Sequence, residues 1–215
     1  MTNDEWRKAI SNRQSKISNH KMLHLGRSFF VRPTLEVART LLGQRLVRIY
    51  NGRRLAGIIT ETEAYIGEED LACHARAGRT ARTQVMYGPG GHAYVYFTYG
   101  MHWMLNFVTE AEGFPAAVLV RAIAPVEGEV TMRRLRGEKP TSILTNGPAK
   151  LTQALAIDGR LNGVDTCASE AVLFVEKVLP PVPEAQVTVS PRVGIDPVPE
   201  PWKSQPWNFK VKRET

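Results

Sequence analysis

The chain has 215 residues, of which 43% are hydrophobic and 23% charged, values typical of a folded globular protein. Its net charge of +7 favours a polyanionic partner, nucleic acid before an anionic membrane surface, although a merely basic soluble protein stays open. No run approaches the roughly 18 apolar residues of a membrane span and no secretory signal is visible, so a cytoplasmic protein is expected.

The first 26 residues are polar and mixed in charge, and we expect residues 1–26 to be a flexible N-terminal segment. Residues 33–43 then predict a helix. Leu35 and Leu41 are among its apolar side chains at helical spacing. Gly43 follows where a glycine commonly ends a helix.

Two hairpins are predicted. The first joins the runs at residues 45–50 and 53–65 around Asn51-Gly52, the strongest short-range signal for such a turn. The second consists of two alternating runs within residues 93–108, interrupted at Tyr99-Gly100.

The remaining elements follow in order: a central strand at residues 116–125, a basic helix at 127–138, a helix within 145–158 and a last strand at 171–177, ahead of a proline-rich tail. Pro148 stands where prolines often begin a helix. Neither an internal repeat nor a linker divides the chain. The prediction is one α+β domain built on a curved, mixed or antiparallel sheet with flanking helices.

Glu61, Glu63 and Tyr65 alternate along the predicted strand, so their side chains share one face. The two carboxylates lie roughly 6.6 Å apart, which suits an acid/base pair, or one catalytic group beside a structural partner of an arginine. A solvated strand face is the alternative. Tyr65 weighs against it, because a solvent-facing surface seldom needs an aromatic ring.

Aromatic residues stand out in the second hairpin. Tyr94 and Tyr96 share one face, and Tyr99 lies at the tip beside a glycine. An aromatic side chain at a hairpin tip of a basic protein suits a wedge or a stacking platform for bases. For Tyr94 alone, a core tyrosine with a satisfied hydroxyl is the better interpretation.

Several polar residues lie where a ligand would meet them. The long connection of residues 66–92 carries His74 and Arg79, which suit contact with a ligand and with phosphate, or form a merely solvated basic loop. Asn106 and Arg121 fall in apolar strands. Each must be paired or line a pocket.

Before the last predicted helix, Gly147 and Lys150 offer a backbone N–H and an ammonium group to a phosphate, although such helix starts are common. Other chemistries lack their motifs: GxxxxGK[ST] and GxGxxG after a strand, HExxH, the zinc-deaminase pattern and GxSxG do not occur. Cys73 and Cys167 lie far apart and are expected to be reduced. We expect neither a metal nor a cofactor.

The chain resembles the alkyladenine (3-methyladenine) DNA glycosylase family in a series of motifs. In order, these are ETEAY, ACHA, AYVYFTYGM followed by LN, VLVRA, NGPAKL, PRVGI and PWNF. They run from about residue 28 to residue 209, and ETEAY with YVYFTYGM at this spacing is the most specific part. The resemblance implies a DNA glycosylase domain over residues 27–215, with a fold like the C-terminal domain of formyltransferases.

The resemblance also implies roles for individual residues. The catalytic glutamate of the family corresponds to Glu63, and the arginine near the water and phosphate corresponds to Arg121. The base-stacking residues correspond to Tyr65, His74 and Tyr96, the intercalating tyrosine to Tyr99, and the asparagine that excludes the amino group of guanine to Asn106.

The implied activity is excision of alkylated purines from double-stranded DNA. The purine is flipped out, a water activated by Glu63 hydrolyses the N-glycosidic bond, and an abasic site remains. We expect Glu63 to face a cavity that holds the purine, in a monofunctional, monomeric enzyme that is nucleoid-associated if bacterial.

Two rival functions are weighed against this one. The first is a non-catalytic nucleic-acid-binding protein on the same scaffold. The second is a carbohydrate hydrolase that uses the carboxylates of Glu61 and Glu63. The basic charge and the tyrosine at the hairpin tip argue against the hydrolase.

Overall fold

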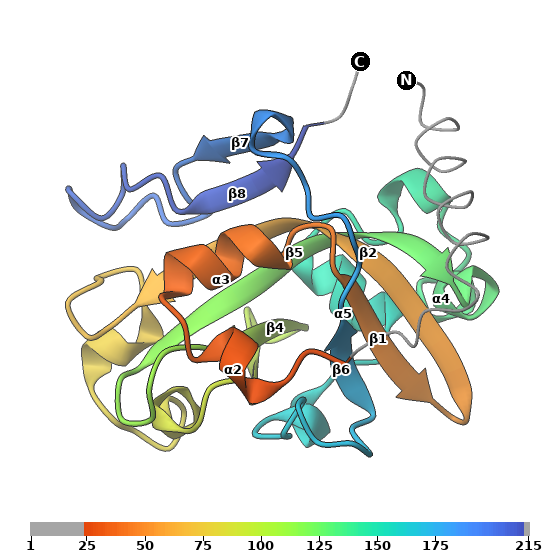
Figure 1. Ribbon diagram of the computed structural model, residues 1–215, viewed down its shortest axis with the longest axis horizontal. Helices are drawn as coiled ribbons and strands as arrows, with labels where there is room; N and C mark the ends of the chain where they lie inside the picture. Colours follow the sequence, from red (N-terminus) through yellow and green to blue (C-terminus); the bar gives the residue numbers. More distant parts are fainter. Residues whose placement is uncertain (1–23, 213–215) are drawn as a thin grey trace.

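The structure is a computed structural model that describes residues 24–212. One antiparallel sheet dominates it, with strand order β3-β4-β5-β2-β1-β6, while β8 pairs with both β2 and β7 (Figure 1). The strands are β1 (Arg45–Tyr50), β2 (Arg53–Ile66), β3 (Ala93–Thr98), β4 (His102–Val108), β5 (Ala116–Glu127), β6 (Leu173–Glu176), β7 (Val187–Ser190) and β8 (Asn208–Val211).

Helices flank this sheet. In the described part of the chain they are α2 (Arg27–Phe30), α3 (Thr34–Leu41), α4 (Glu129–Leu135) and α5 (Pro148–Ala154). Short 3-10 turns are η1 (His74–Ala77), η2 (Gln84–Tyr87), η3 (Thr141–Ile143), η4 (Gly159–Leu161) and η5 (Glu184–Gln186). The predicted α+β class, with an antiparallel sheet and flanking helices, is confirmed.

Both predicted hairpins are present. Asn51 and Gly52 join β1 to β2 with φ angles of 49° and 69°, the left-handed pair that a two-residue type I′ turn requires. Tyr99 and Gly100, at the tip of β3–β4, have φ angles of 52° and 66°. Left-handed φ is uncommon for a bulky residue, so Tyr99 is displayed in a conformation that the tight turn imposes.

β2 is flanked by three other strands. β5 lies along one side, while the opposite side pairs with β1 at residues 53–58 and with β8 at residues 61–63. β1 and β8 therefore share one side of β2. This exchange of neighbours places β8 beside the segment that carries Glu63.

The register between β2 and β5 shifts at a β-bulge. Glu61 pairs with Ala122 and Thr62 with Val120, so Arg121 is the extra residue on β5. Bulges bend a strand and re-aim a side chain. Here the guanidinium of Arg121 turns onto the face of the sheet that carries Glu61.

α3 lies across the sheet in Figure 1 and packs against β2 and β5. Its buried stripe runs through Thr34, Val37, Ala38 and Leu41. Leu35, which also lies at helical spacing, is 37% exposed and does not belong to this buried stripe.

α5 begins at Pro148 after an N-cap at Gly147, as predicted. Leu151, Ala154 and Leu155 are fully buried and belong to the same core as the buried face of α3. α5 packs against β4 and β5, and the basic helix α4 packs against α5. The start of α5 is thereby fixed beside the two strands that carry Asn106 and Arg121.

The proline-rich tail contains two strands that the sequence did not indicate. β7 and β8 pair with each other, and Asn208 at the start of β8 pairs with Glu63 of β2. Each strand has four residues and lies among prolines. An alternating pattern needs a longer run to be recognised.

The predicted N-terminal segment lies outside the described residues, except for residues 24–26. Of these, His24 forms a bridge with Glu176 of β6, and Leu25 is buried. Within residues 24–212, no helix has the length and apolar character needed to cross a membrane.

Replacing Leu41 by Ala is expected to lower the free energy of unfolding by about 2–5 kcal/mol, because it opens a cavity under α3. Leu35→Ala removes the same atoms from an exposed site and should lower it by less than about 1 kcal/mol. Urea unfolding followed by circular dichroism measures both. Equal losses would contradict the burial pattern of α3.

Candidate active site

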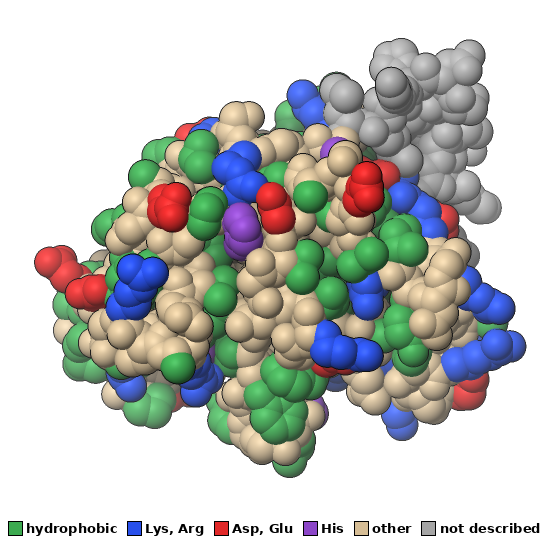
Figure 2. Space-filling view, turned by 90° about the horizontal axis from the view of Figure 1, so that it is seen from below, with side chains coloured by type: hydrophobic (Ala, Val, Ile, Leu, Met, Phe, Trp, Pro, Cys, Tyr) green, Lys and Arg blue, Asp and Glu red, His purple; other side chains and the backbone are tan. Residues whose placement is uncertain are grey.

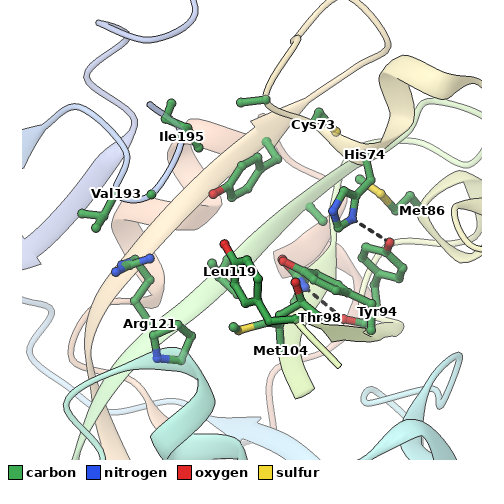
Figure 3. A pocket seen from close by; sticks show the side chains of 18 residues that line it. Cys73, His74, Met86, Tyr94, Thr98, Met104, Leu119, Arg121, Val193 and Ile195 are labelled. Carbon is green, nitrogen blue, oxygen red and sulfur yellow. Dashed lines mark hydrogen bonds between the residues drawn. The ribbon is translucent and has the colours of Figure 1, made fainter. Parts of the chain in front are cut away.

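A cavity of about 340 Å³ is walled by β2, β3, β4, β5, the loop after β2 and the segment after β7. Figure 3 shows Arg121 and Val193 toward one end and His74, Met86 and Tyr94 toward the other. Aromatic and apolar side chains dominate the wall, with a few polar groups between them. Such a site suits a flat organic ligand of modest size.

Glu63, in the middle of β2, has no exposed surface. Its Oε2 accepts hydrogen bonds from Tyr65 Oη at 2.9 Å and Arg121 Nη1 at 3.2 Å. Its Oε1 accepts from the backbone N–H of Val193 at 2.7 Å and Asn208 Nδ2 at 3.0 Å. A carboxylate has about four acceptor positions, so these donors satisfy the buried group in place of water.

The cavity wall separates Glu63 from the cavity itself. Tyr65, Arg121 and Val193 line the cavity and also donate to Glu63, whereas the lining, as far as the structure describes the chain, leaves Glu63 out. The expectation that Glu63 faces the cavity is therefore corrected: its carboxylate lies one side chain behind the wall. The donors that a buried carboxylate requires occupy the space between.

Glu61 lies on the same face but has other partners. It accepts hydrogen bonds from Arg121 Nε at 2.8 Å and Asn208 Nδ2 at 3.2 Å, and Lys210 Nζ lies 3.0 Å away. Burial raises the pKa of Glu61, but hydrogen bonds from those three residues outweigh burial and leave the pKa below its ordinary value. Glu61 is thus held as a paired anion, which weighs against its use as a catalytic acid.

A buried ion pair packs against the ring of Tyr65 and holds it in place. The guanidinium of Arg192 lies over the Tyr65 ring, 4.8 Å from its centre. Arg192 donates to both carboxylate oxygens of Asp70, at 2.5 and 2.8 Å, and both side chains are fully buried. Asp70 also accepts from the backbone N–H of Ala72. One ion pair thereby joins the end of β2, the loop that follows it and the segment that carries Val193.

His74 begins η1 and meets two tyrosines in the cavity wall (Figure 3). Its Nδ1 lies 2.9 Å from Tyr94 Oη, and its ring meets that of Tyr96 edge-on with 4.5 Å between the ring centres. Asn106 Nδ2 donates to the backbone carbonyl of Tyr94 at 3.1 Å, which fixes the orientation of its amide. These four residues come together from β3, β4 and the long loop.

Tyr99 also lines the cavity, yet it is 78% exposed at the hairpin tip. Its neighbours Phe97 and Met101 are exposed as well. Three exposed apolar side chains on one turn form a projecting surface that suits contact with another molecule.

The predicted phosphate contacts do not lie together in the cavity wall. Arg79 is exposed on the loop after β2. Lys150 donates to Asn146 at 2.8 Å, and Gly147 precedes Pro148, a lining residue. Figure 2 shows Lys and Arg side chains spread over one face of the molecule, with acidic side chains between them.

Sequence reasoning missed several contributors to the site. Val193 and Asn208 donate to Glu63, and the Asp70–Arg192 pair holds Tyr65. The sequence indicated these residues only through the motifs PRVGI and PWNF, which contain Arg192, Val193 and Asn208. A backbone N–H and an asparagine in a proline-rich tail show no chemistry until the fold brings them to a carboxylate.

Within residues 24–212, no three His, Cys, Asp or Glu side chains are placed to hold a metal ion. Cys73 and Cys167 are free thiols. Burial raises the pKa of Cys73 to about 12 and that of Cys167 to about 11. Neither thiol is therefore set up as a nucleophile.

Comparison with known proteins points to one family. The model of the methylpurine-DNA glycosylase (MPG) family matches residues 28–215. A relative from Methanocella arvoryzae, named "Putative 3-methyladenine DNA glycosylase", is 51% identical over 189 residues, which cover 87% of this chain and 92% of the relative. A relative of the same name from Carboxydothermus hydrogenoformans is 50% identical over 188 residues, with 87% and 95% covered.

Identity of this extent over most of the chain makes the protein a DNA glycosylase, a hydrolase of the N-glycosidic bond that acts in base excision repair. Among DNA glycosylases, the chain belongs to the methylpurine-DNA glycosylase family. The resemblance seen in the sequence motifs is thereby confirmed.

The pKa of His74 is lowered to about 4 by burial and by the nearby charges of Arg82 and Arg76. A lowered pKa means that the imidazole is neutral near pH 7 and takes up a proton only in acid. An NMR titration of its Cε1–H should therefore have its midpoint near pH 4. Arg82→Gln removes one of the charges and should raise that midpoint. A midpoint near 6.5 in the parent protein would contradict the buried environment of His74.

Proposed function

We propose that this enzyme flips alkylated purines such as 3-methyladenine out of duplex DNA and hydrolyses their N-glycosidic bond with a water activated by Glu63. An abasic site is left. The observation that carries the proposal is the buried Glu63 carboxylate directly behind an aromatic cavity, with the exposed Tyr99 at its edge. The name shared by the relatives, 3-methyladenine DNA glycosylase, supports this substrate class.

The cavity accounts for recognition of the base. A purine reaches it only after leaving the stacked duplex, at a cost of about a few kcal/mol. Tyr65, His74 and Tyr96 then stack against the base, and the electron-rich tyrosine faces attract a purine that alkylation has made cationic. Asn106, whose amide is held by the backbone of Tyr94, is the residue that excludes the extra amino group of guanine in this proposal.

The buried carboxylate accounts for hydrolysis. As the bond breaks, the sugar gains oxocarbenium character, which an anion at Glu63 stabilises, and the same group accepts the proton of the attacking water. Base catalysis of this kind contributes about 10²–10⁴-fold. Arg121 holds the carboxylate from the cavity side. A cationic purine leaves without prior protonation. The reaction therefore needs no general acid, and Glu61 can remain a paired anion.

DNA binding is assigned to the outer surface. Tyr99 enters the duplex and fills the space that the flipped nucleotide vacates. Arg79, Gly147 and Lys150 contact phosphates, and the net charge of +7 adds affinity that does not depend on sequence and weakens with salt.

In this proposal the enzyme is a monofunctional monomer that acts in the cytoplasm. The four donors to Glu63 and the cavity wall come from one chain, so a monomer suffices. The cavity wall described here contains no lysine to form a Schiff base, which fits a monofunctional enzyme. Its place is the cytoplasm, with the nucleoid as substrate in a bacterium.

The alternative is a protein that binds DNA on this scaffold without catalysis. A buried carboxylate behind the cavity argues against it. A protein that only binds a polyanion gains nothing from Glu63 and bears the free-energy cost of burying it. Arg121 would also be free to contact phosphate if Glu63 and Glu61 were absent.

Glu63→Gln is expected to abolish base release while lesion-containing duplex is still bound, because the amide accepts no proton. The loss should be about 10²-fold or more. Base release from methylated duplex and a gel-shift titration measure the two effects. Glu61→Gln, a matched change two residues away, should slow base release far less than Glu63→Gln, because its amide oxygen can still accept from Arg121 and Asn208. Excision by Glu63→Gln at the parent rate would refute the mechanism.

Tyr99→Ala should weaken binding to a damaged duplex far more than binding to single-stranded DNA, since only the duplex offers a space for the ring to fill. The expected loss on duplex is about tenfold or more, the value of one stacking contact of about 1–3 kcal/mol. Fluorescence anisotropy with both DNAs measures it. Equal losses on the two DNAs would remove the wedge role.

A further inference from the structure

Two tyrosines of the cavity wall each have an arginine against the ring. The guanidinium of Arg192 lies 4.8 Å from the centre of the Tyr65 ring. The guanidinium of Arg82 lies 5.2 Å from the centre of the Tyr96 ring. Both tyrosines line the cavity, whereas the lining described here includes neither arginine. Two cations therefore lie next to the aromatic wall without being part of it.

The two cations differ in whether a carboxylate balances them. The side chain of Arg192 is fully buried and pairs with both carboxylate oxygens of Asp70. Arg82 is exposed on the loop after β2, and within residues 24–212 no carboxylate forms an ion pair with it. The charge of Arg192 is thus compensated where it lies, while the charge of Arg82 is free to act on the cavity.

The charge of Arg82 acts on three side chains of the cavity wall. Burial raises the pKa of Tyr94 and that of Tyr96, and the charge of Arg82 opposes both rises. Burial lowers the pKa of His74, and the same charge lowers it further. A nearby positive charge lowers a pKa because it disfavours the more positive form of the group. Arg82 therefore makes the potential at this end of the cavity more positive.

We propose that Arg82 is a specificity-determining residue, which shifts the preference of the cavity from cationic alkylated purines toward neutral damaged purines. This inference rests on the function proposed above. The guanidinium repels a cationic purine, and the ring of Tyr96 attracts such a purine less because it already interacts with Arg82. A neutral purine is not repelled. When its N-glycosidic bond breaks, the electron pair leaves with the base, and Arg82 stabilises the negative charge that develops there.

Arg82→Gln tests this role, because it removes the charge and keeps a polar side chain. The probes are a methylated duplex, which releases 3-methyladenine from a cationic nucleotide, and a duplex with one hypoxanthine, a neutral purine. The values of kcat/KM for both are measured near pH 7, where His74 is neutral. Their ratio, 3-methyladenine over hypoxanthine, should rise by about 2- to 5-fold, the scale of one exposed charge. Weaker binding to phosphates affects both probes alike and cancels in the ratio.

Two further variants serve as controls. Arg82→Lys keeps the positive charge and should keep the ratio close to that of the parent. Arg79→Gln removes the same charge from the same loop, where the guanidinium lies 5.7 Å from the centre of the Tyr87 ring. Tyr87 is not among the residues that line the cavity. Arg79→Gln should therefore slow release of both bases by the same factor.

The outcomes separate this inference from the function on which it rests. If Arg82→Gln slows release of both bases equally, Arg82 only contacts DNA and the inference is wrong. A parent enzyme that releases 3-methyladenine but no hypoxanthine would also overturn it and leave the proposed function standing. If the parent releases neither base, the proposed function itself fails.

The parent enzyme alone provides a second test, which holds even if Arg82→Gln does not fold. Because Arg82 is exposed, added salt screens its charge. The ratio of kcat/KM for 3-methyladenine to that for hypoxanthine should therefore rise with salt, while the loss of DNA affinity common to both probes cancels. A ratio that stays constant or falls would mean that no exposed charge acts on the base.

Discussion

The rest of this structure depends on the burial of one charge, the carboxylate of Glu63. Removing an ion from water costs about several kcal/mol unless other groups replace the lost hydrogen bonds. Tyr65 supplies one from the same strand, Arg121 one from the bulge in β5, Val193 one from its backbone and Asn208 one from β8. Around Glu63, β2 therefore needs β5 on one side and β8 on the other. β1 pairs with β2 only at residues 53–58, before Glu63 is reached.

The same requirement explains why a second charge pair is buried nearby. The N–H of Val193 must aim at Glu63, and its neighbour Arg192 is fixed by Asp70 and by the backbone carbonyl of Ala64 in β2. Breaking such a pair by removing one partner typically costs about 3–5 kcal/mol. The segment after β7, which has little regular structure, is thus fixed by side-chain and backbone hydrogen bonds where it forms one wall of the cavity.

The features that could be predicted from the sequence are those with local causes. Asn51-Gly52 and Tyr99-Gly100 mark their turns by backbone preference, Pro148 marks a helix start, and alternation puts Glu61 and Glu63 on one face. The depth of Glu63 could not be predicted, because it depends on donors up to 145 residues away. The strands of the tail were missed for the same reason. β8 forms because the side of β2 beyond β1 offers it hydrogen-bonding partners, and these exist only in the assembled sheet.

The separation along the chain has a consequence for biosynthesis. Val193 and Asn208 follow Glu63 by 130 and 145 residues, so a ribosome must add 145 further residues after Glu63 before the carboxylate has its full set of donors. Until then a nascent chain has neither a fully paired anion nor the cavity wall that Val193 completes. A chain that stops before Asn208 therefore lacks part of the hydrogen-bonding shell that satisfies this buried carboxylate.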